Sequence, residues 1–284
     1  RQKDSWNVKS RELIEISIKR LSEAGIDNSR FIVFLLSKEI LSLTEVDLLL
    51  DTKREIESSL TVEFFSAVKR VAKGEPIDYV LGYKDFFGIR LELSPCVLIP
   101  RSETEELVEI VIEEEKDSKV FADIGTGSGA IACALARSLP SATVFATDIS
   151  TEAIALAEQN ARNNGISNVK FIDGDNLNGL GEYLNSVEVL VSNPPYIRTT
   201  DIDLLDVSIK NHEPLTALDG GKDGLDFYRE FFRNLPRGKR VYLEISQYET
   251  DGLRKLFSEI EGYSCEFRKD LSGNYRFMIL LPIG

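Results

Sequence analysis

From about residue 120 onward, strand patterns and helix patterns alternate regularly along the chain, and few folds are compatible with this alternation. Short apolar runs, typical of buried strands, lie at residues 120–124, 143–147, 169–172, 187–192 and 241–245. Helical spacing follows the first two of these runs, at residues 130–138 and 151–163. Repeated strand–helix units predict an α/β fold with a doubly wound, mainly parallel sheet and helices on both faces.

The carboxyl-terminal end of the chain breaks this alternation. Strand patterns at residues 263–267 and 277–281 follow one another with no helical segment between them. Two consecutive strands joined by a short loop pair most simply as a hairpin. We therefore expect a C-terminal antiparallel hairpin in addition to the parallel strands.

The first 75 residues read as a small all-helical domain. Features typical of short helices are the apolar face of Leu13, Ile14, Ile18 and Leu21, the largely apolar segment 31–41, the capping-box pair Thr44 and Asp47, and the segment from Thr61 to Gly74. After Glu75 and Pro76 the pattern turns at Gly88 and alternates like a hairpin arm. We expect three parts: a helical bundle at 1–75, a hairpin linker at 76–100 and the α/β domain at 101–284.

The charge balance weighs against a nucleic-acid-binding protein. There are 47 acidic and 34 basic residues, and a net charge of −13 repels phosphates at long range. The longest apolar run in the N-terminal third covers only residues 31–36, and the start lacks the apolar core of a signal peptide. Neither a nucleic acid nor a membrane is therefore an expected partner.

Cysteine and histidine usage argues against a metal centre. Cys96, Cys133 and Cys265 lie far apart in sequence, and His212 is the single histidine. These residues offer no metal-ligand spacing, and the odd number of cysteines gives no disulfide framework. We expect no metal and a reducing, cytoplasmic location.

A glycine-rich turn follows the first expected strand. It reads Asp123-Ile124-Gly125-Thr126-Gly127-Ser128-Gly129 and leads into a helix. Glycines there permit a tight turn and let the backbone approach a ligand. The pattern by itself also fits part of a dinucleotide fingerprint or a purely structural turn.

Acidic residues near this turn favour S-adenosylmethionine as the ligand. Asp148 ends the second strand, where a carboxylate can accept both ribose hydroxyl protons, although it could equally serve as a helix N-terminal charge. Asp123 suits a ligand with an ammonium and a sulfonium better than it suits a pyrophosphate. Asp175 and Asn176 end the third strand, where we expect the adenine ring.

The most specific signal is Asn193-Pro194-Pro195-Tyr196, directly after the fourth strand. The prolines fix the backbone and remove two N–H donors, so the carbonyls stay available as acceptors. The Asn193 side-chain oxygen and the Pro194 carbonyl could hold both N–H bonds of a planar nitrogen against the methyl sulfonium. We expect Asn193, Pro194 and Tyr196 to be catalytic, with Tyr196 on the flat face of the substrate. A rigid proline turn is the structural alternative.

Several motifs together resemble the HemK/PrmC family of protein-(glutamine-N5) methyltransferases. They are the segments 75–82 (EPIDYVLG), 98–105 (LIPRSETE), 123–129 (DIGTGSG), 193–196 (NPPY), 213–218 (EPLTAL) and 220–226 (GGKDGLD). The resemblance is close over residues 75–230 and extends to the helical region in layout only. One departure is Ser102-Glu103, where many members have Pro-Asp.

The resemblance implies a class I methyltransferase that uses S-adenosylmethionine and releases S-adenosylhomocysteine. The implied substrate is the glutamine in the Gly-Gly-Gln loop of class-1 peptide release factors, with the helical bundle as docking domain. The cofactor set is Asp123, Gly125, Thr126, Gly127, Ser128, Gly129, Asp148, Asp175, Asn176 and Asn193. The substrate set is Asn193, Pro194, Pro195, Tyr196, Arg101 and Glu213, although Arg101 also reads as part of a charged helix start.

Other functions compete with this one. An adenine or cytosine methyltransferase could use the same grip on an exocyclic amine, but it must hold phosphates, which a net charge of −13 disfavours. A dinucleotide-binding or non-catalytic domain would explain the glycines but not Asn193 to Tyr196. The loop from Gly220 to Gly224 is either a plain connection or a lid over the glutamine pocket.

Overall fold

The structure, a computed structural model, describes residues 8–49 and 54–283. The described residues divide into two compact units. One holds the described residues up to Gly82 together with Val207–His212, and the other holds Tyr83–Asp206 and the residues from Glu213 onward. The boundaries expected at residues 75 and 100 stay predictions, and residues 1–7 and 50–53 of the expected bundle lie outside the described residues.

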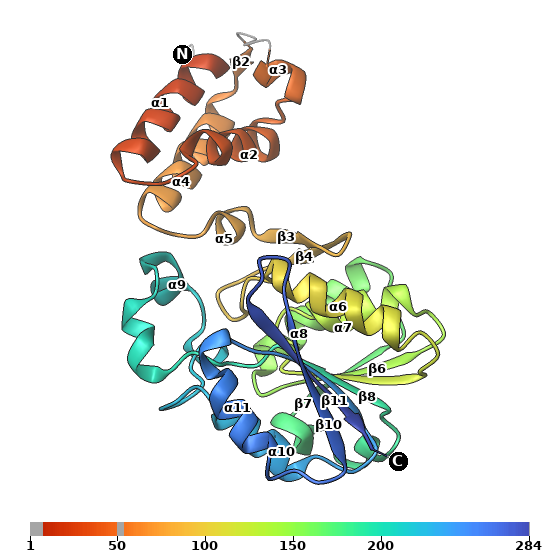
Figure 1. The fold of residues 1–284 in the computed structure, drawn as a ribbon. Helices are drawn as coiled ribbons and strands as arrows, with labels where there is room; N and C mark the ends of the chain where they lie inside the picture. Colours follow the sequence, from red (N-terminus) through yellow and green to blue (C-terminus); the bar gives the residue numbers. More distant parts are fainter. Residues whose placement is uncertain (1–7, 50–53, 284) are drawn as a thin grey trace. The chain divides into compact units, whose positions relative to one another are not determined.

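The first unit is helical (Figure 1). Its elements are β1 (Val8–Lys9), α1 (Ser10–Glu23), α2 (Ser29–Leu41), α3 (Glu45–Leu49), β2 (Glu55–Ile56), α4 (Ser58–Ala72), α5 (Ile77–Leu81) and α9 (Val207–His212). The capping box is confirmed, because the Asp47 carboxylate accepts from the Thr44 amide at 2.9 Å and the Thr44 hydroxyl accepts from the Asp47 amide at 3.1 Å. Helix α4 begins three residues before the expected Thr61, whose amide already donates to the Glu57 carbonyl at 3.0 Å.

In the described part of the second unit, seven strands form one sheet in the order β10-β11-β9-β8-β5-β6-β7. The strands are β5 (Val120–Ile124), β6 (Thr143–Asp148), β7 (Val169–Asp173), β8 (Val189–Ser192), β9 (Arg240–Glu244), β10 (Tyr263–Lys269) and β11 (Tyr275–Pro282). Strands β5 to β9 run parallel, whereas β11 is antiparallel to both β9 and β10. The predicted parallel sheet and C-terminal hairpin are confirmed.

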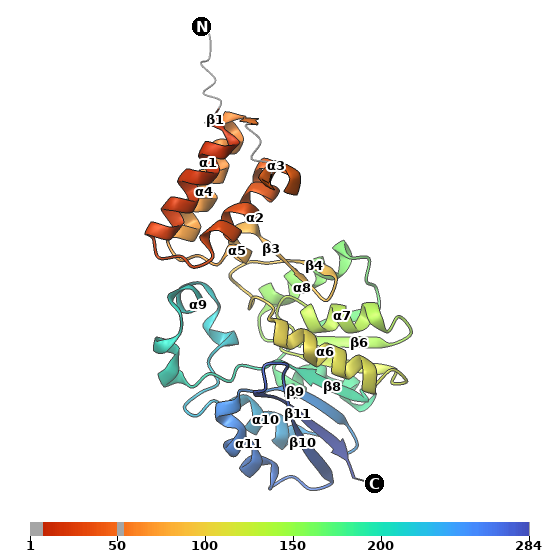
Figure 2. The same cartoon turned by 45° about the horizontal axis from the view of Figure 1, so that its top comes forward.

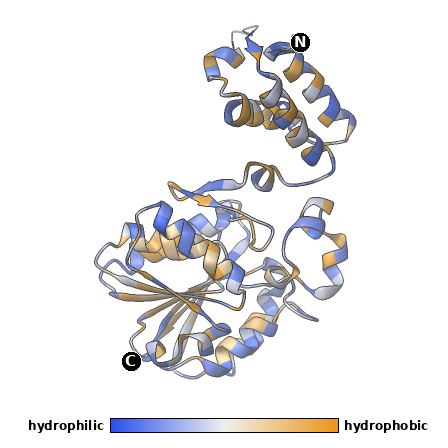
Figure 3. Cartoon of the chain, turned by 180° about the vertical axis from the view of Figure 1, so that it is seen from behind, coloured by the Kyte–Doolittle hydropathy of each residue, from blue (hydrophilic) through white to orange (hydrophobic). Residues whose placement is uncertain are grey.

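Helices cover both faces of this sheet (Figures 1 and 2). The helices of the first face are α6 (Ser102–Glu114), α7 (Ala130–Ser138) and α8 (Thr151–Asn163), and those of the second are η1 (Asn176–Asn185), α10 (Asp226–Asn234) and α11 (Thr250–Phe257). The central strands β5, β8 and β9 are predominantly apolar, because both of their faces are buried, and the sheet accordingly carries much of the orange colour in Figure 3. Among residues 8–49 and 54–283, no helix is long and apolar enough to cross a bilayer.

The hairpin of β3 (Tyr83–Phe86) and β4 (Ile89–Glu92) belongs to this second unit. Its turn places Phe87 at φ 47° and Gly88 at φ 75°, the left-handed pair that a tight hairpin turn requires. Asn160 of α8 fastens the end of β4, because its amide oxygen accepts from the Glu92 amide at 2.7 Å. The Asn160 amide nitrogen also donates to the Ser128 carbonyl at 2.9 Å, which ties the hairpin to the glycine-rich turn.

Four short elements lie between β8 and α11. They are η2 (Thr199–Leu204), α9, η3 (Leu215–Ala217) and η4 (Gln247–Glu249). The sequence patterns did not predict them, because 3₁₀ turns and single helical turns are too short to show a periodic apolar face.

Candidate active site

The glycine-rich turn is folded tightly against the end of β6. The amides of Gly125 and Thr126 both donate to the Thr147 carbonyl, at 2.9 and 2.8 Å. Gly125, Gly127 and Gly129 have φ of 75°, 55° and 83°, a region in which side chains are strained. A Cβ at Gly129 would also lie 3.1 Å from the Ala157 side chain. The three glycines therefore let the chain turn and let α7 start close to α8.

Asp148 holds this turn in place. One carboxylate oxygen accepts from the Gly127 amide at 2.8 Å, and the other accepts from the Ser150 amide at 2.9 Å. Burial raises the pKa of Asp148, and the backbone donors act against that shift. Each oxygen keeps a further lone pair for a ligand hydroxyl. The Asp148 carboxylate thus stabilises the loop through these two hydrogen bonds. Its binding of a ribose hydroxyl remains a prediction.

Asp123 lies beneath the turn, with its side chain fully buried. Its Oδ2 accepts from the Thr126 hydroxyl at 2.6 Å and from the Ala132 amide at 3.1 Å, whereas Oδ1 has no partner among the described residues. Desolvation raises the pKa of Asp123 to about 7. An unpartnered buried carboxylate oxygen beside a glycine turn fits a cationic ligand of the kind that the sequence predicts.

A cavity of about 540 Å³ opens above the turn in the second unit. It brings together most of the predicted site residues: Gly125, Thr126, Gly127, Ser128, Asp148, Asp175, Asn176, Asn193, Pro194 and Pro195. The remaining predicted residues do not line it in the described structure: Asp123, Gly129, Tyr196, Arg101 and Glu213. Volume and lining suit a ligand with both polar and apolar parts.

Sequence reasoning missed part of this wall. Additional lining residues are Cys96, Val97, Leu98, Pro100, Thr104, Ile149, Phe227 and the segment 214–217. Phe227 stacks on Phe231, with ring centroids 5.7 Å apart. No sequence signal distinguishes Phe227, which lines the cavity, from its helical neighbours Tyr228 and Phe231, which are fully buried in the core.

A chain of hydrogen bonds leads from the cavity into the interior. The Asn193 amide nitrogen donates to the Thr104 hydroxyl at 2.9 Å, and that hydroxyl donates to a Glu244 carboxylate oxygen at 2.7 Å. Glu244 ends β9 and is 1% exposed. Desolvation raises the pKa of Glu244 to about 7, although the hydrogen bond from Thr104 acts in the opposite direction.

Tyr196 also belongs to this chain. Its hydroxyl donates to the second Glu244 oxygen at 3.3 Å, and burial raises the pKa of the phenol. The structure thus places the Tyr196 hydroxyl against the interior carboxylate and not on the cavity wall. Its predicted contact with the flat face of the substrate stays a prediction.

The loop from Gly220 to Gly224 packs against the backbone of the Asn-Pro-Pro-Tyr segment. The Gly220 amide donates to the Ile197 carbonyl at 2.7 Å. A Cβ at Gly220 would lie 2.8 Å from the Tyr196 Cα, and one at Gly224 would lie 2.5 Å from the Tyr196 carbonyl oxygen. Of the two readings of this loop, the structure supports a connection that buttresses Tyr196.

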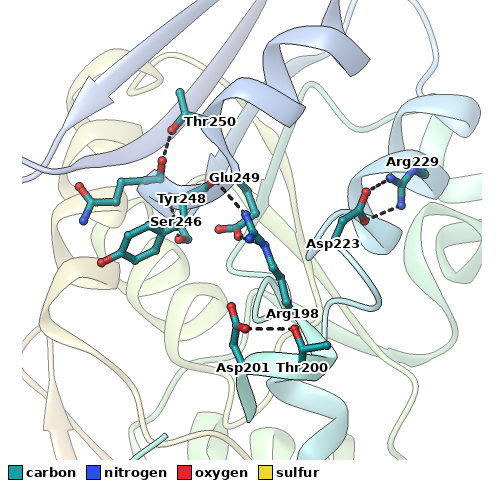
Figure 4. Close-up of polar contacts among 10 residues, drawn as sticks. Arg198, Thr200, Asp201, Asp223, Arg229, Ser246, Tyr248, Glu249 and Thr250 are labelled. Atoms are coloured by element: carbon teal, nitrogen blue, oxygen red, sulfur yellow. Dashed lines mark hydrogen bonds and ion pairs between the residues drawn. The ribbon is translucent and has the colours of Figure 1, made fainter. Parts of the chain in front are cut away.

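A polar cluster anchors the chain just after this segment (Figure 4). Arg198 points toward Glu249, with 3.1 Å between the guanidinium Nε and the carboxylate, and Glu249 is 5% exposed. Arg229 forms an ion pair with Asp223 in the same region. The first contact links Arg198 to the residue that precedes α11, and the second links the loop at Asp223 to α10.

Arg101 and Glu213 bind each other. Their side chains are 2.5 Å apart, and the Glu213 carboxylate also accepts from the Ile99 amide at 3.3 Å. Pro100 and Pro214, the neighbours of this pair, line the cavity. The ion pair therefore fastens two segments of the cavity wall, and its predicted contact with substrate remains a prediction.

We expect the free energy of unfolding to fall as the pH rises from about 5 to about 8. Asp123 and Glu244 have pKa values raised to about 7, so the folded state holds protons that the unfolded state has lost. Their contribution is complete below the unfolded pKa and is lost as the pH passes through 7. Carboxyls such as Glu266, whose pKa is lowered by Arg268, are ionised in both states in this window.

Urea unfolding at several pH values measures this slope. The double variant Asp123→Asn/Glu244→Gln should flatten this slope. Together the two carboxyls should change the free energy of unfolding by at most a few kcal/mol, since one pKa unit corresponds to about 1.4 kcal/mol. An equal slope in the wild type and the variant would contradict the assignment.

Comparison with known proteins identifies the family. Residues 12–82 match the PrmC N-terminal domain, and residues 115–263 match a methyltransferase domain. The release factor glutamine methyltransferase of Geobacter sulfurreducens is 34% identical over 272 residues, which cover 94% of each chain. The protein of the same name from Bacillus cereus is 39% identical over 248 residues, with 84% of this chain and 87% of the relative covered. The chain belongs to the release factor glutamine methyltransferase family.

Structural comparison agrees with the fold of a release factor glutamine methyltransferase. The catalytic domain of hMettl16, solved in complex with a MAT2A 3'UTR hairpin, matches with a TM-score of 0.55. The match covers 88% of this chain and 91% of that chain at 15% identity, so it concerns the fold alone. The predicted class I methyltransferase fold is confirmed. The match to a methyltransferase domain implies a methyl donor of the S-adenosylmethionine type.

Proposed function

We propose that this protein transfers a methyl group from S-adenosylmethionine to the side-chain amide nitrogen of the glutamine in the Gly-Gly-Gln loop of class-1 release factors. The observation that carries the proposal is the position of Asn193 at the wall of the cavity, with its amide nitrogen occupied by Thr104. Its side-chain oxygen is thereby left as an acceptor for a substrate N–H. Identity of 34–39% to release factor glutamine methyltransferases supports the choice of substrate.

The residues of the cavity divide between cofactor and substrate. The glycine turn, Asp148, Asp175 and Asn176 would hold the cofactor, which supplies an electrophilic methyl group when bound. Asn193 and the Pro194 carbonyl would each accept one N–H of the glutamine amide and direct its nitrogen at that methyl group. No strong base is needed, because the nitrogen becomes acidic as it gains the methyl group.

Methylation of release factors tests this proposal directly. Purified protein is incubated with S-adenosylmethionine and a class-1 release factor, and peptides are analysed by mass spectrometry. We expect a single added methyl group on the glutamine of the Gly-Gly-Gln loop and formation of S-adenosylhomocysteine. Methylation of adenine or cytosine in DNA or RNA, with the release factor unmodified, would favour the nucleic-acid alternative.

We further propose that the helical unit docks the release factor. We also propose that the enzyme is located in the cytoplasm, together with its substrate. Several large apolar side chains of this unit are exposed: Ile16, Phe31, Val46 and Val62. If a partner covers exposed apolar side chains, their removal from water favours association. The unit would thus recognise a part of the folded release factor other than the reacting glutamine.

The variant Phe31→Ser/Val62→Ser should raise KM for intact release factor about tenfold, the cost of roughly 1.4 kcal/mol of lost contact. KM for a short Gly-Gly-Gln peptide should not change, because the peptide lacks the parts of the release factor that the helical unit would bind. Leu271→Ser is a matched control, since Leu271 is 93% exposed in the other unit. Equal KM values for intact release factor in the wild type and the double variant would exclude these side chains from docking.

A further inference from the structure

The direction of the hydrogen bonds around Asn193 is fixed by a residue that does not reach substrate. Glu244 is buried, and its two carboxylate oxygens face the Thr104 and Tyr196 hydroxyls. The single hydroxyl proton of Thr104 is donated to one of these oxygens at 2.7 Å, and the Tyr196 hydroxyl donates to the other at 3.3 Å. The Thr104 oxygen is then an acceptor toward Asn193.

This polarity decides which end of the Asn193 amide faces the cavity. An asparagine amide has nearly the same shape in its two flipped orientations, and only its hydrogen-bond partners distinguish them. The acceptor at Thr104 selects the orientation in which nitrogen points inward, at 2.9 Å. The oxygen is therefore presented outward, where a substrate amide would donate.

We propose that Thr104, oriented by Glu244, is a positioning residue that holds Asn193 with its side-chain oxygen toward the substrate nitrogen. The inference rests on the proposed function, because it assigns the carbonyl of Asn193 as the substrate acceptor. Thr104 lies on α6, 89 residues before Asn193, and is 3% exposed. The contact between Thr104 and Asn193 therefore depends on the tertiary structure, because the two residues are far apart in sequence.

Thr104→Val keeps the shape of the side chain and removes the acceptor. The Asn193 amide then loses the preference for its inward nitrogen, and a fraction of molecules presents N–H groups to a substrate N–H. We expect kcat for release-factor methylation to fall roughly tenfold to a hundredfold, the range for one buried donor left unpaired. Affinity for S-adenosylmethionine, measured by calorimetry, should stay within about twofold, and Thr104→Ser should restore most of kcat.

A double-mutant cycle separates positioning from a general packing effect. If Thr104 acts through Asn193, Thr104→Val should cost nothing further in an Asn193→Ala background. Thr250→Val is the matched control: Thr250 is also buried, at 7% exposed, and its hydroxyl donates to the Gln247 carbonyl at 2.9 Å. That variant should retain wild-type kcat.

Two results would overturn the inference alone: wild-type kcat in Thr104→Val, or additive losses in the double variant. Both leave the proposed function intact as long as Asn193→Ala is impaired. Wild-type activity in Asn193→Ala would instead overturn the assignment of the substrate acceptor, and this inference with it. The three outcomes therefore distinguish a wrong positioning role from a wrong mechanism.

Discussion

Replacing Asn193 with alanine should lower kcat for methyl transfer by about 10²–10³ while cofactor affinity stays nearly unchanged. The physical reason is the loss of one preorganised acceptor at the reacting nitrogen, which typically costs roughly 2.7–4 kcal/mol of transition-state stabilisation. The side chain lies at the cavity wall, and its inward bond to Thr104 keeps it oriented before substrate arrives. Single-turnover methylation of a release factor measures the chemical step, and calorimetry measures cofactor binding.

Asn193→Asp is the sharper probe of the same residue. The carboxylate keeps an acceptor on the substrate side but adds a negative charge, which stabilises the cationic cofactor more than the charge-dispersed transition state. It also replaces the inward N–H by an oxygen that faces the Thr104 oxygen, so a donor–acceptor pair becomes a repulsive contact. We expect lower turnover, with cofactor binding retained or tighter.

Asn163→Ala provides the control for both variants. Asn163 is exposed on α8, and its amide nitrogen donates to the Glu92 side chain at 2.8 Å. Its removal should leave kcat unchanged. If Asn193→Ala and Asn193→Asp both keep wild-type activity, Asn193 is a turn residue and the proposed mechanism has to be abandoned.

Replacing Asp148 with alanine should have the second-largest effect, on cofactor affinity. A lost charge-assisted hydrogen bond costs about 1.5–3 kcal/mol, which corresponds to a rise in Kd of about 10–150-fold. The structure adds a second reason, because the amides of Gly127 and Ser150 lose their shared acceptor and the glycine turn is loosened. Calorimetric titration with S-adenosylmethionine measures the change.

Asp148→Asn separates the two contributions. The amide oxygen can still accept from one backbone N–H, but the charge is lost, so its Kd should lie between those of the wild type and Asp148→Ala. Asp85→Ala is a matched control, since Asp85 is an exposed carboxylate that pairs with Arg90 outside the cavity. Wild-type affinity in a folded Asp148→Ala would remove Asp148 from the cofactor site.

Local pattern was enough to predict most of the elements. Strand β5 begins and ends where its apolar run does, and the pair Thr44 and Asp47 forms the expected cap, because strands and caps depend on residues close in sequence. The motifs 123–129 and 193–196 likewise mark the ends of β5 and β8. Parallel strands bring their carboxyl ends to one edge, so these two loops were bound to meet.

Patterns and motifs in the sequence were therefore enough to predict the α/β fold, the glycine turn, the Asn-Pro-Pro-Tyr segment and the family. The tertiary structure was needed to reveal the contacts that hold these motifs in position. It joins Asn193 to Thr104 and Glu244, 89 residues before it and 51 after it along the chain, and it pairs Arg101 with Glu213 across 112 residues. Contacts over such separations depend on how helices pack on the sheet, and a single buried glutamate or threonine carries no local pattern that reveals its partner.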